Sequence, residues 1–328
     1  SDAYESMKKT TDVSVMNGKD IFIRGLGDRY ASAQLDGQQL PGTDPYKNSP
    51  QLDLIPANLL ENIITSKTFT PDQPGNFTGG NVDIQTRSFP DKFTFKVSMG
   101  AGYNDQASMN NNFLTHKGGR TDWLGYDDGT RSIPGILKDT MVSQFLTRTV
   151  DIRASREDSL AHMLDQASNS VLNQMAPGTK TSGLNNKFSL SLGNQVKLFG
   201  KPLGFLGGIS YKKDYSYYGD GVSALYFLAD SGAQELTKDY YFSDTRGIEN
   251  TQISGILNLA YKYGKNHSIE FKTIYNHDGE NDNRYLAGSW PGGISNSSNI
   301  FETRSLHFTE RELRIFKLSG TNVFGFAN

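Results

Sequence analysis

The chain of 328 residues contains no cysteine, only two tryptophans, and no surplus of charge of either sign. The absence of cysteine excludes disulfide bonds, thiolate zinc sites and cysteine nucleophiles, but leaves the redox compartment open. The 33 basic residues balance 35 acidic ones, so nothing in the net charge favours nucleic acid as a partner. No run approaches the roughly 18 consecutive apolar residues of a membrane helix, which excludes a helical membrane protein. A membrane β-barrel is not excluded, because its spans alternate apolar and polar residues.

The usual signatures of catalysis and cofactor binding are also missing. Gly25 and Gly27 lie between Arg24 and Arg29 after the apolar run 21–23, as in a phosphate-binding loop. A dinucleotide loop needs a third glycine at position 30, which is Tyr30 here, and a helix that does not fit before the turn at 36–37. The five histidines lack metal-ligand spacing. We expect no enzymatic activity, no cofactor and no metal site.

Alternating apolar and polar residues dominate the chain after residue 90. The first run places Phe93, Phe95 and Val97 on one face of a strand and Lys92 and Lys96 on the other. Similar runs cover residues 92–103, 187–198, 203–211, 252–263, 268–276 and 303–318. In the last run the apolar residues change parity between 306–308 and 313–315, which predicts a β-bulge.

Short and long connections alternate between these runs. Turns are expected at 199–202, 263–266 and 319–322, and long polar loops at about 104–185, 214–249 and 278–302. Residues 160–175 have helical periodicity, which predicts one amphipathic helix inside the first long loop. The short-long rhythm, with tyrosines near the strand ends, favours part of an antiparallel transmembrane β-barrel of about six strands. A soluble β-sandwich remains an alternative, because its strands alternate in the same way.

The first 88 residues have a different pattern. Short strands are predicted at 13–15, 21–23, 33–35 and 63–67, with a hairpin turn at Asp36-Gly37 and a short helix near 53–60. Residues 1–88 therefore form a small mixed α/β unit, and residues 89–328 form the strand-rich remainder. The segment 88–90 is the expected hinge between them.

An ordered set of short motifs in residues 13–87 resembles the plug domain of TonB-dependent outer-membrane receptors. The set comprises Ile-Arg-Gly at 23–25, Asp-Arg-Tyr at 28–30, Leu-Asp-Gly at 35–37, Ile-Pro at 55–56, the strand 63–67, Pro71-Asp72, Gly75, Gly79-Gly80 and Val-Asp-Ile-Gln-Thr at 82–86. The segment 123–131, with Ile133-Pro134, resembles receptors of the Bacteroidota. The plug-motif residues, expected to be structural or gating, are Arg24, Gly25, Gly27, Arg29, Asp36, Gly37, Lys67, Gly79 and Gly80.

The resemblance implies a plug inside the lumen of a 22-stranded barrel in the bacterial outer membrane. It implies TonB-dependent import of a scarce nutrient, such as a ferric chelate, a glycan or a peptide. The implied partners are the TonB-ExbB-ExbD complex, outer-membrane lipid, a surface lipoprotein lid and the small-molecule or oligomeric ligand. The chain is expected to begin inside the plug, downstream of the TonB box. The alternatives are a docking or assembly subunit with the same fold and a soluble β-sandwich binding module.

The resemblance also suggests roles for particular residues. Arg24 and Arg29 would anchor the plug to carboxylates of the wall, with Glu270 as one candidate partner, or act only within the plug. Ligand contacts are expected from the aromatic stretches at 215–226, 240–242 and 290–293.

Overall fold

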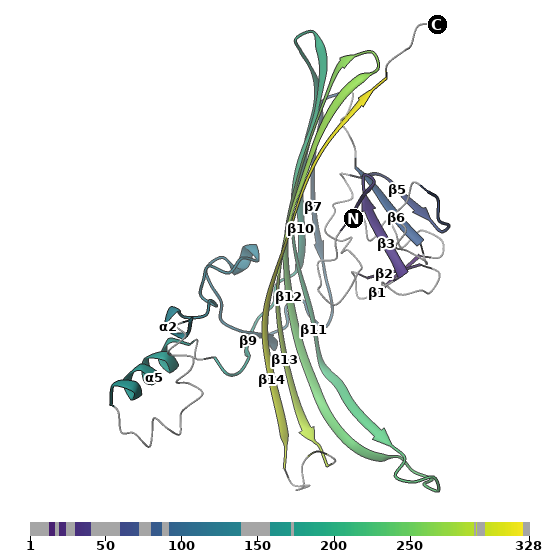
Figure 1. The fold of residues 1–328 in the computed structure, drawn as a ribbon. Coiled ribbons are helices and arrows are strands. Elements are labelled where there is room, and N and C mark those ends of the chain that lie inside the picture. The colour runs from purple at the N-terminus through teal and green to yellow at the C-terminus, as the bar shows by residue number, and fades with distance from the viewer. Residues whose placement is uncertain are drawn as a thin grey trace.

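A curved sheet of six long strands dominates the computed structural model (Figure 1). The structure describes residues 13–16, 20–23, 30–40, 60–71, 80–86, 92–138, 158–171, 174–291, 293 and 299–323. The strands of the large sheet are β7 (Thr94–Gly102), β10 (Asn185–Leu198), β11 (Lys201–Phe227), β12 (Thr237–Gly264), β13 (His267–Ser289) and β14 (Phe301–Asn322). Their order, β14-β13-β12-β11-β10-β7, follows the chain, and every neighbouring pair is antiparallel. The six predicted runs are therefore confirmed as strands, joined in one sheet rather than divided between two stacked antiparallel sheets.

Tight turns join the strands at one end of the sheet, as predicted. At the β10–β11 turn, Phe199 and Gly200 have φ of 50° and 73°, the signs that a type I′ hairpin requires. The β12–β13 turn at 263–266 is equally short. The predicted turn at 319–322 is wrong, because these residues continue β14 and Asn322 pairs with His267.

The strands extend much further at the other end than the hydrophobic pattern predicted. Most of 214–249 belongs to β11 and β12, and 278–289 belongs to β13, so the expected long loops shrink to 228–236 and 290–300. Both faces of the sheet carry polar side chains in this region, and the apolar alternation therefore stops before the strands do. The backbone ladder continues through pairs such as Arg246↔Arg284.

The predicted bulge in residues 303–318 is also wrong. β13 and β14 keep a one-to-one register from Gly288↔Phe301 to His267↔Asn322. The apolar residues change parity because each face of β14 is covered by a different part of the chain. Phe308 lies under the Arg131 guanidinium, whereas Leu313 and Ile315 pack against the N-terminal residues on the opposite face.

The N-terminal strands form two small sheets beside the large one. β1 (Val13–Met16) pairs with β2 (Asp20–Ile23), and the second sheet has the order β4 (Gln38–Gln39), β3 (Ala31–Leu35), β6 (Gly80–Thr86), β5 (Leu60–Ser66). β3 and β6 are parallel, while the other pairs are antiparallel. These strands, β1 to β6, are called the N-unit below. The predicted strands are confirmed, whereas the helix near 53–60 and the hinge at 88–90 fall outside the described residues.

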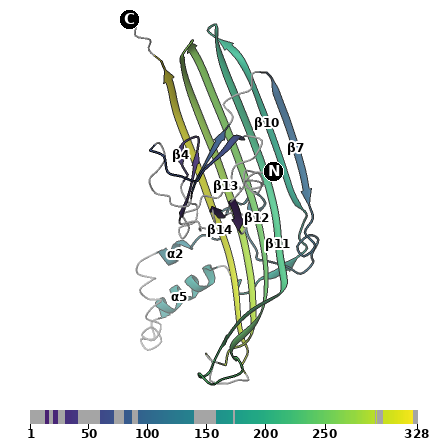
Figure 2. The same cartoon turned by 90° about the vertical axis from the view of Figure 1, so that its right-hand side faces the viewer.

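Residues between β7 and β10 lie on the other side of the large sheet from the N-unit (Figures 1 and 2). They contain β8 (Phe113–Thr115), the 3₁₀-helix η4 (Asp122–Leu124), α2 (Gly135–Lys138), α5 (Asp158–Ser170) and β9 (Gly178–Lys180). The predicted amphipathic helix is confirmed as α5, and it ends at Ser170, before the predicted end. Within the described residues, no helix is both long enough and apolar enough to cross a membrane.

Candidate functional site

The N-unit lies against one face of the large sheet, which we call the N-unit face; the opposite side is the far face. Residues paired directly across neighbouring strands point to the same face. The pair Lys272↔Lys317 and the pair Ile256↔Ile274 therefore lie on the N-unit face. Tyr211↔Ile253 lies on the far face. The sheet thus separates two environments, each contacted by a different part of the chain.

The Asp36-Gly37 turn is the point at which the N-unit bonds to the sheet. Asp36 and Gly37 have φ of 50° and 78°, as a type I′ turn requires, and glycine meets this condition without strain. The Asp36 carboxylate accepts hydrogen bonds from the backbone N–H of Thr86, at 2.9 Å, and from its hydroxyl, at 2.7 Å. The Gly37 N–H donates to Asp83 at 2.9 Å. The turn is therefore held on β6 by contacts within the N-unit, in addition to its contacts with the large sheet.

Two lysines of the sheet hold this turn. The Lys272 ammonium lies 3.3 Å from the Asp36 carboxylate and donates to the Thr86 hydroxyl at 3.3 Å. The Lys317 ammonium donates to the Asp36 carbonyl oxygen. Lys272 and Lys317 are direct cross-strand neighbours, an unfavourable arrangement for two like charges unless an anion lies between them. Asp36 supplies that anion, and we call these three residues, together with Thr86, the Asp36 latch.

The same interface has an apolar part. Ile256 and Ile274 of the sheet belong to one buried cluster with the N-unit residues Ile23, Leu35, Val82 and Ile84. Leu313 and Ile315 of β14 pack against this cluster. The N-unit is therefore held by buried apolar surface as well as by charge, whereas the resemblance suggested only charged anchors.

The predicted plug-motif residues are only partly brought together. Asp36 and Gly37 form the latch turn, and Gly80 lies where an added Cβ would meet Ile23 at 2.9 Å. Lys67 follows β5 and is not among the latch contacts. Arg24, Gly25, Gly27, Arg29 and Gly79 fall outside the described residues. Glu270, the suggested partner of an arginine, lies 3.4 Å from the Lys272 ammonium instead.

Sequence reasoning missed Lys272, Lys317 and Thr86. The charges are placed opposite to the expectation. The sheet supplies the cations and the N-unit supplies the carboxylate, whereas arginines of the N-unit and carboxylates of the wall were expected. The available signal was weak: one lysine lies in each of two neighbouring predicted strands, and only the fold establishes that the two face each other.

The predicted aromatic stretches separate onto both faces. Tyr240 stacks on Phe242 at 5.0 Å between centroids, and Phe242 and Trp290 both contact Phe301. This cluster is on the N-unit face, at the end of the sheet away from the tight turns. Tyr215, in contrast, contacts Phe113 on the far face at 5.5 Å.

The far face has an uncharged zone next to the tight turns. No Asp, Glu, Lys or Arg occurs among the far-face residues at 95–101 on β7, 188–198 on β10, 203–211 on β11, 253–261 on β12, 269–275 on β13 and 316–318 on β14. Large apolar side chains are exposed there, among them Met99 at 76%, Ile209 at 56% and Phe316 at 71%. An apolar patch of this extent indicates a surface that contacts another protein or a membrane.

Beyond this zone the far face becomes polar and is covered. Residues 113–131, called the collar, lie over it together with β9. Gly125 and Gly279 touch through their backbones, since a Cβ added to Gly279 would lie 2.1 Å from the Gly125 oxygen. His277 donates from Nε2 to that oxygen at 2.8 Å and stacks on Tyr126, with ring centroids 3.6 Å apart.

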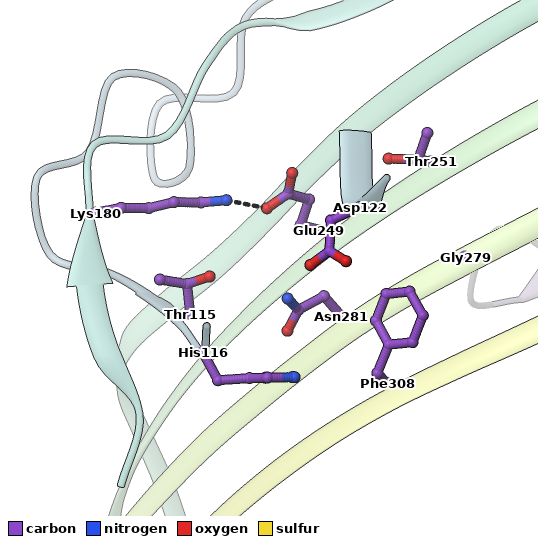
Figure 3. A pocket seen from close by; sticks show the side chains of 9 residues that line it. All are labelled: Thr115, His116, Asp122, Lys180, Glu249, Thr251, Gly279, Asn281 and Phe308. Carbon is purple, nitrogen blue, oxygen red and sulfur yellow. Dashed lines mark hydrogen bonds and ion pairs between the residues drawn. The ribbon is translucent and has the colours of Figure 1, made fainter. Parts of the chain in front are cut away.

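A cavity of about 70 Å³ remains between the collar and the sheet (Figure 3). It is lined by Thr115, His116, Asp122, Lys180, Glu249, Thr251, Gly279, Asn281 and Phe308. Sites for small-molecule ligands usually have about 300 to 1,000 Å³, so this cavity suits a few waters rather than a nutrient. No group of three or more metal-ligating side chains occurs within the part of the chain that the structure describes.

Charged residues fix the collar internally and to the sheet. The Arg131 guanidinium bridges Asp122, at 2.8 Å, and Asp127, at 3.1 Å, and lies over the Phe308 ring. The His116 Nδ1–H donates to the Asn283 side-chain oxygen at 2.8 Å. Burial lowers the pKa of His116, and the positive charge of Arg131 lowers it further. The hydrogen bond to Asn283 acts in the opposite direction but does not outweigh these two effects. His116 is therefore a neutral donor at neutral pH.

The chain was compared with known proteins. No protein-family model and no characterised protein sequence matches it. Among solved structures it is similar to the ferric enterobactin receptor PfeA in complex with BCV-L6, with 10% identity, 95% of this chain and 44% of that chain covered, and a TM-score of 0.36. It is also similar to a mutant of PfeA from Pseudomonas aeruginosa, with 11% identity, 98% of this chain and 47% of that chain covered, and a TM-score of 0.36. For the outer membrane transporter YddB from Escherichia coli, the identity is 11%, 100% of this chain and 44% of that chain are covered, and the TM-score is 0.35. The chain spans less than half of each of these proteins.

Proposed function

We propose that the chain is the plug and the first part of the wall of a TonB-dependent outer-membrane transporter. In this proposal the N-unit is the plug, the N-unit face lines the lumen, and the uncharged zone of the far face meets outer-membrane lipid. The chain imports a scarce nutrient when the TonB-ExbB-ExbD complex pulls on the plug. The motif order in residues 13–87 supports this assignment.

The Asp36 latch is the observation that carries the proposal. A unit that only had to stay in place could rely on the apolar cluster alone. Lys272 is 7% exposed, and its ammonium has partners on the N-unit, so the ion pair is largely shielded from water and from salt. A buried pair depends strongly on geometry, because separating the charges leaves each without its partner. In this proposal, displacement of the plug requires the buried pair of Asp36 and Lys272 to separate.

The absence of cysteine makes the gating role directly testable. In one variant, Asp36→Cys and Lys317→Cys are bridged by a short bis-maleimide, which ties the plug to the wall. In the control variant, Asp36→Cys and Thr86→Cys are bridged within the plug. We expect the first bridge to stop energy-dependent uptake and the control bridge to permit it. Unimpaired uptake with the plug tied to the wall would refute gating by plug movement.

The ligand is proposed to approach the aromatic cluster of Tyr240, Phe242, Trp290 and Phe301. These rings lie on the N-unit face beyond the plug, where a ligand entering from outside the cell would first meet the lumen. Beside them, Arg284 forms a two-point ion pair with Asp244, at 2.8 and 2.6 Å. A surface lipoprotein lid over this end belongs to the same proposal.

A docking or assembly subunit is the alternative function. Both functions require the sheet to be embedded in the outer membrane, but only transport requires the plug to move. A chain that binds its partners at the cell surface and shows no uptake dependent on TonB would favour this alternative.

A further inference from the structure

The far face inverts the usual relation between polarity and burial. Thr251 and His277 are 1% and 3% exposed, although they are polar, whereas Leu257 on the same face is 40% exposed. The collar buries the polar side chains, and nothing in the described part of the chain covers the apolar ones. Two neighbouring zones of one face are therefore suited to different surroundings.

The change between the zones occurs at one level across the sheet. Tyr211, Ile253 and Tyr275 mark it on β11, β12 and β13, since Tyr211 pairs with Ile253 and Tyr275 pairs with Gly255. The next far-face residues on β11 and β12 are Lys213 and Thr251. The collar reaches this level through the Tyr211 hydroxyl, which donates to the Trp123 carbonyl at 2.9 Å.

We propose that the collar is a lipid stop, which covers the far face immediately outside the bilayer and places Trp123 among the lipid headgroups. This inference rests on the proposed function, because it assumes that the uncharged zone is embedded in the outer membrane. It adds that residues 113–131 determine how far lipid reaches along the wall.

The dimensions of the uncharged zone support a bilayer as its occupant. From Ile253 to Tyr263, β12 extends about 34 Å, which at a strand tilt of about 45° gives a height of roughly 24 Å. Membrane barrels have an apolar band of about 25 Å, bordered by aromatic residues. Tyr261 and Tyr263 border the zone on the side of the tight turns, and Tyr211 and Tyr275 border the other side.

Trp123 has the properties of an interfacial anchor. Its side chain is 58% exposed, and tryptophan is favoured where an apolar ring meets water. The collar approaches the sheet too closely for lipid to enter beneath it, because Gly125 and Gly279 are in backbone contact. Charged collar residues such as Arg120 and Asp128 would stay on the aqueous side.

Depth-dependent quenching tests the proposal, and the absence of native cysteine allows single labels. Leu257→Cys, Trp123→Cys and Phe227→Cys each carry an environment-sensitive fluorophore in dioleoylphosphatidylcholine vesicles. We expect acyl-chain nitroxides to quench position 257, headgroup nitroxides to quench position 123, and aqueous iodide to quench position 227. Iodide quenching at 257 would contradict membrane embedding and thus the proposed function. Shielding at 257 with iodide-only quenching at 123 would refute the lipid stop alone.

A second set of variants separates the collar from the rest of the fold. Gly279→Ala removes the space that Gly125 occupies, and we expect it to abolish headgroup quenching at 123 while 257 stays shielded. Gly255→Ala is the matched control, because its added Cβ lies 3.9 Å from the nearest atom. Tyr126→Ala loosens the collar from the other side by removing the ring stacked on His277. If headgroup quenching at 123 survives in both collar variants, the collar does not set the boundary.

Discussion

At the residue scale, the Asp36 latch illustrates how one carboxylate can serve two purposes. The carboxylate of Asp36 closes the turn onto Thr86 and also pairs with Lys272, so the same group orders the N-unit and attaches it to the sheet. The backbone carbonyl of Asp36 accepts a further hydrogen bond from Lys317. The exposed fractions of the Lys272 and Asp36 side chains are only 9% and 12%, so removing one partner leaves the other charge largely buried and costs more than at a surface ion pair.

The latch should appear as a coupling energy in a double-mutant cycle. We expect Asp36→Ala and Lys272→Ala to show an interaction free energy of about 0.5 to 3 kcal/mol, as directly contacting residues do. The measurement is the urea dependence of N-unit release, followed by protease cleavage of residues 60–71. Lys197→Ala, an exposed lysine on β10, is the control and should show additive effects with Asp36→Ala. Additivity of the Asp36 and Lys272 variants would contradict the latch.

The collar should weaken in mild acid because of His116. Its pKa in the folded protein lies below the ordinary value of 6.5, so the released collar binds more protons than the docked one. The free energy that holds the collar on the sheet is therefore constant above about pH 6.5. It decreases as the pH falls from 6.5 through the lowered pKa of His116. The emission of Trp123 in a Trp290→Phe variant reports this transition. His116→Gln should remove the transition in this window, and its persistence would assign it to another group.

At the element scale, β14 shows why one strand can carry two apolar patterns. Ile315 packs against the N-unit cluster, while the adjacent Phe316 is 71% exposed on the far face. Successive side chains of a strand point to opposite faces, so neighbouring residues meet different surroundings without any break in register.

This pair of neighbours provides a prediction with an internal control. Ile315→Asp should release the N-unit, because it places a charge in a buried apolar cluster, and should leave vesicle association unchanged. Phe316→Asp should weaken vesicle association and leave the N-unit attached. Protease accessibility of the N-unit and flotation with vesicles measure the two effects. Identical phenotypes for both variants would mean that β14 does not separate two environments.

At the scale of the whole molecule, the uncharged zone determines how the chain behaves in water. Exposed apolar surface of this extent, together with β7 and β14 as the edge strands of the described six-stranded sheet, favours association. We expect the purified chain to aggregate in buffer and to become monodisperse in detergent, as measured by light scattering. A stable monomer in buffer alone would instead support the soluble binding module.

The sequence by itself determined the strands, because backbone alternation and short turns are local properties. It predicted six strands, the Asp36-Gly37 turn and the α5 helix correctly. It failed where tertiary contacts replace local pattern. β11 and β12 continue past the apolar alternation because polar side chains there find partners across the strands, as Arg246 does with Asp282.

Only the tertiary structure decided which residues meet. Lys272 and Asp36 are distant in the sequence and come together because register and the docking of the N-unit bring them to one point. The collar folds onto the far face because two glycines permit backbone contact there, and neither glycine is distinctive in the sequence. Local periodicity thus fixed the elements, whereas the pairing of charges and the division of the far face depend on contacts between residues remote in the chain.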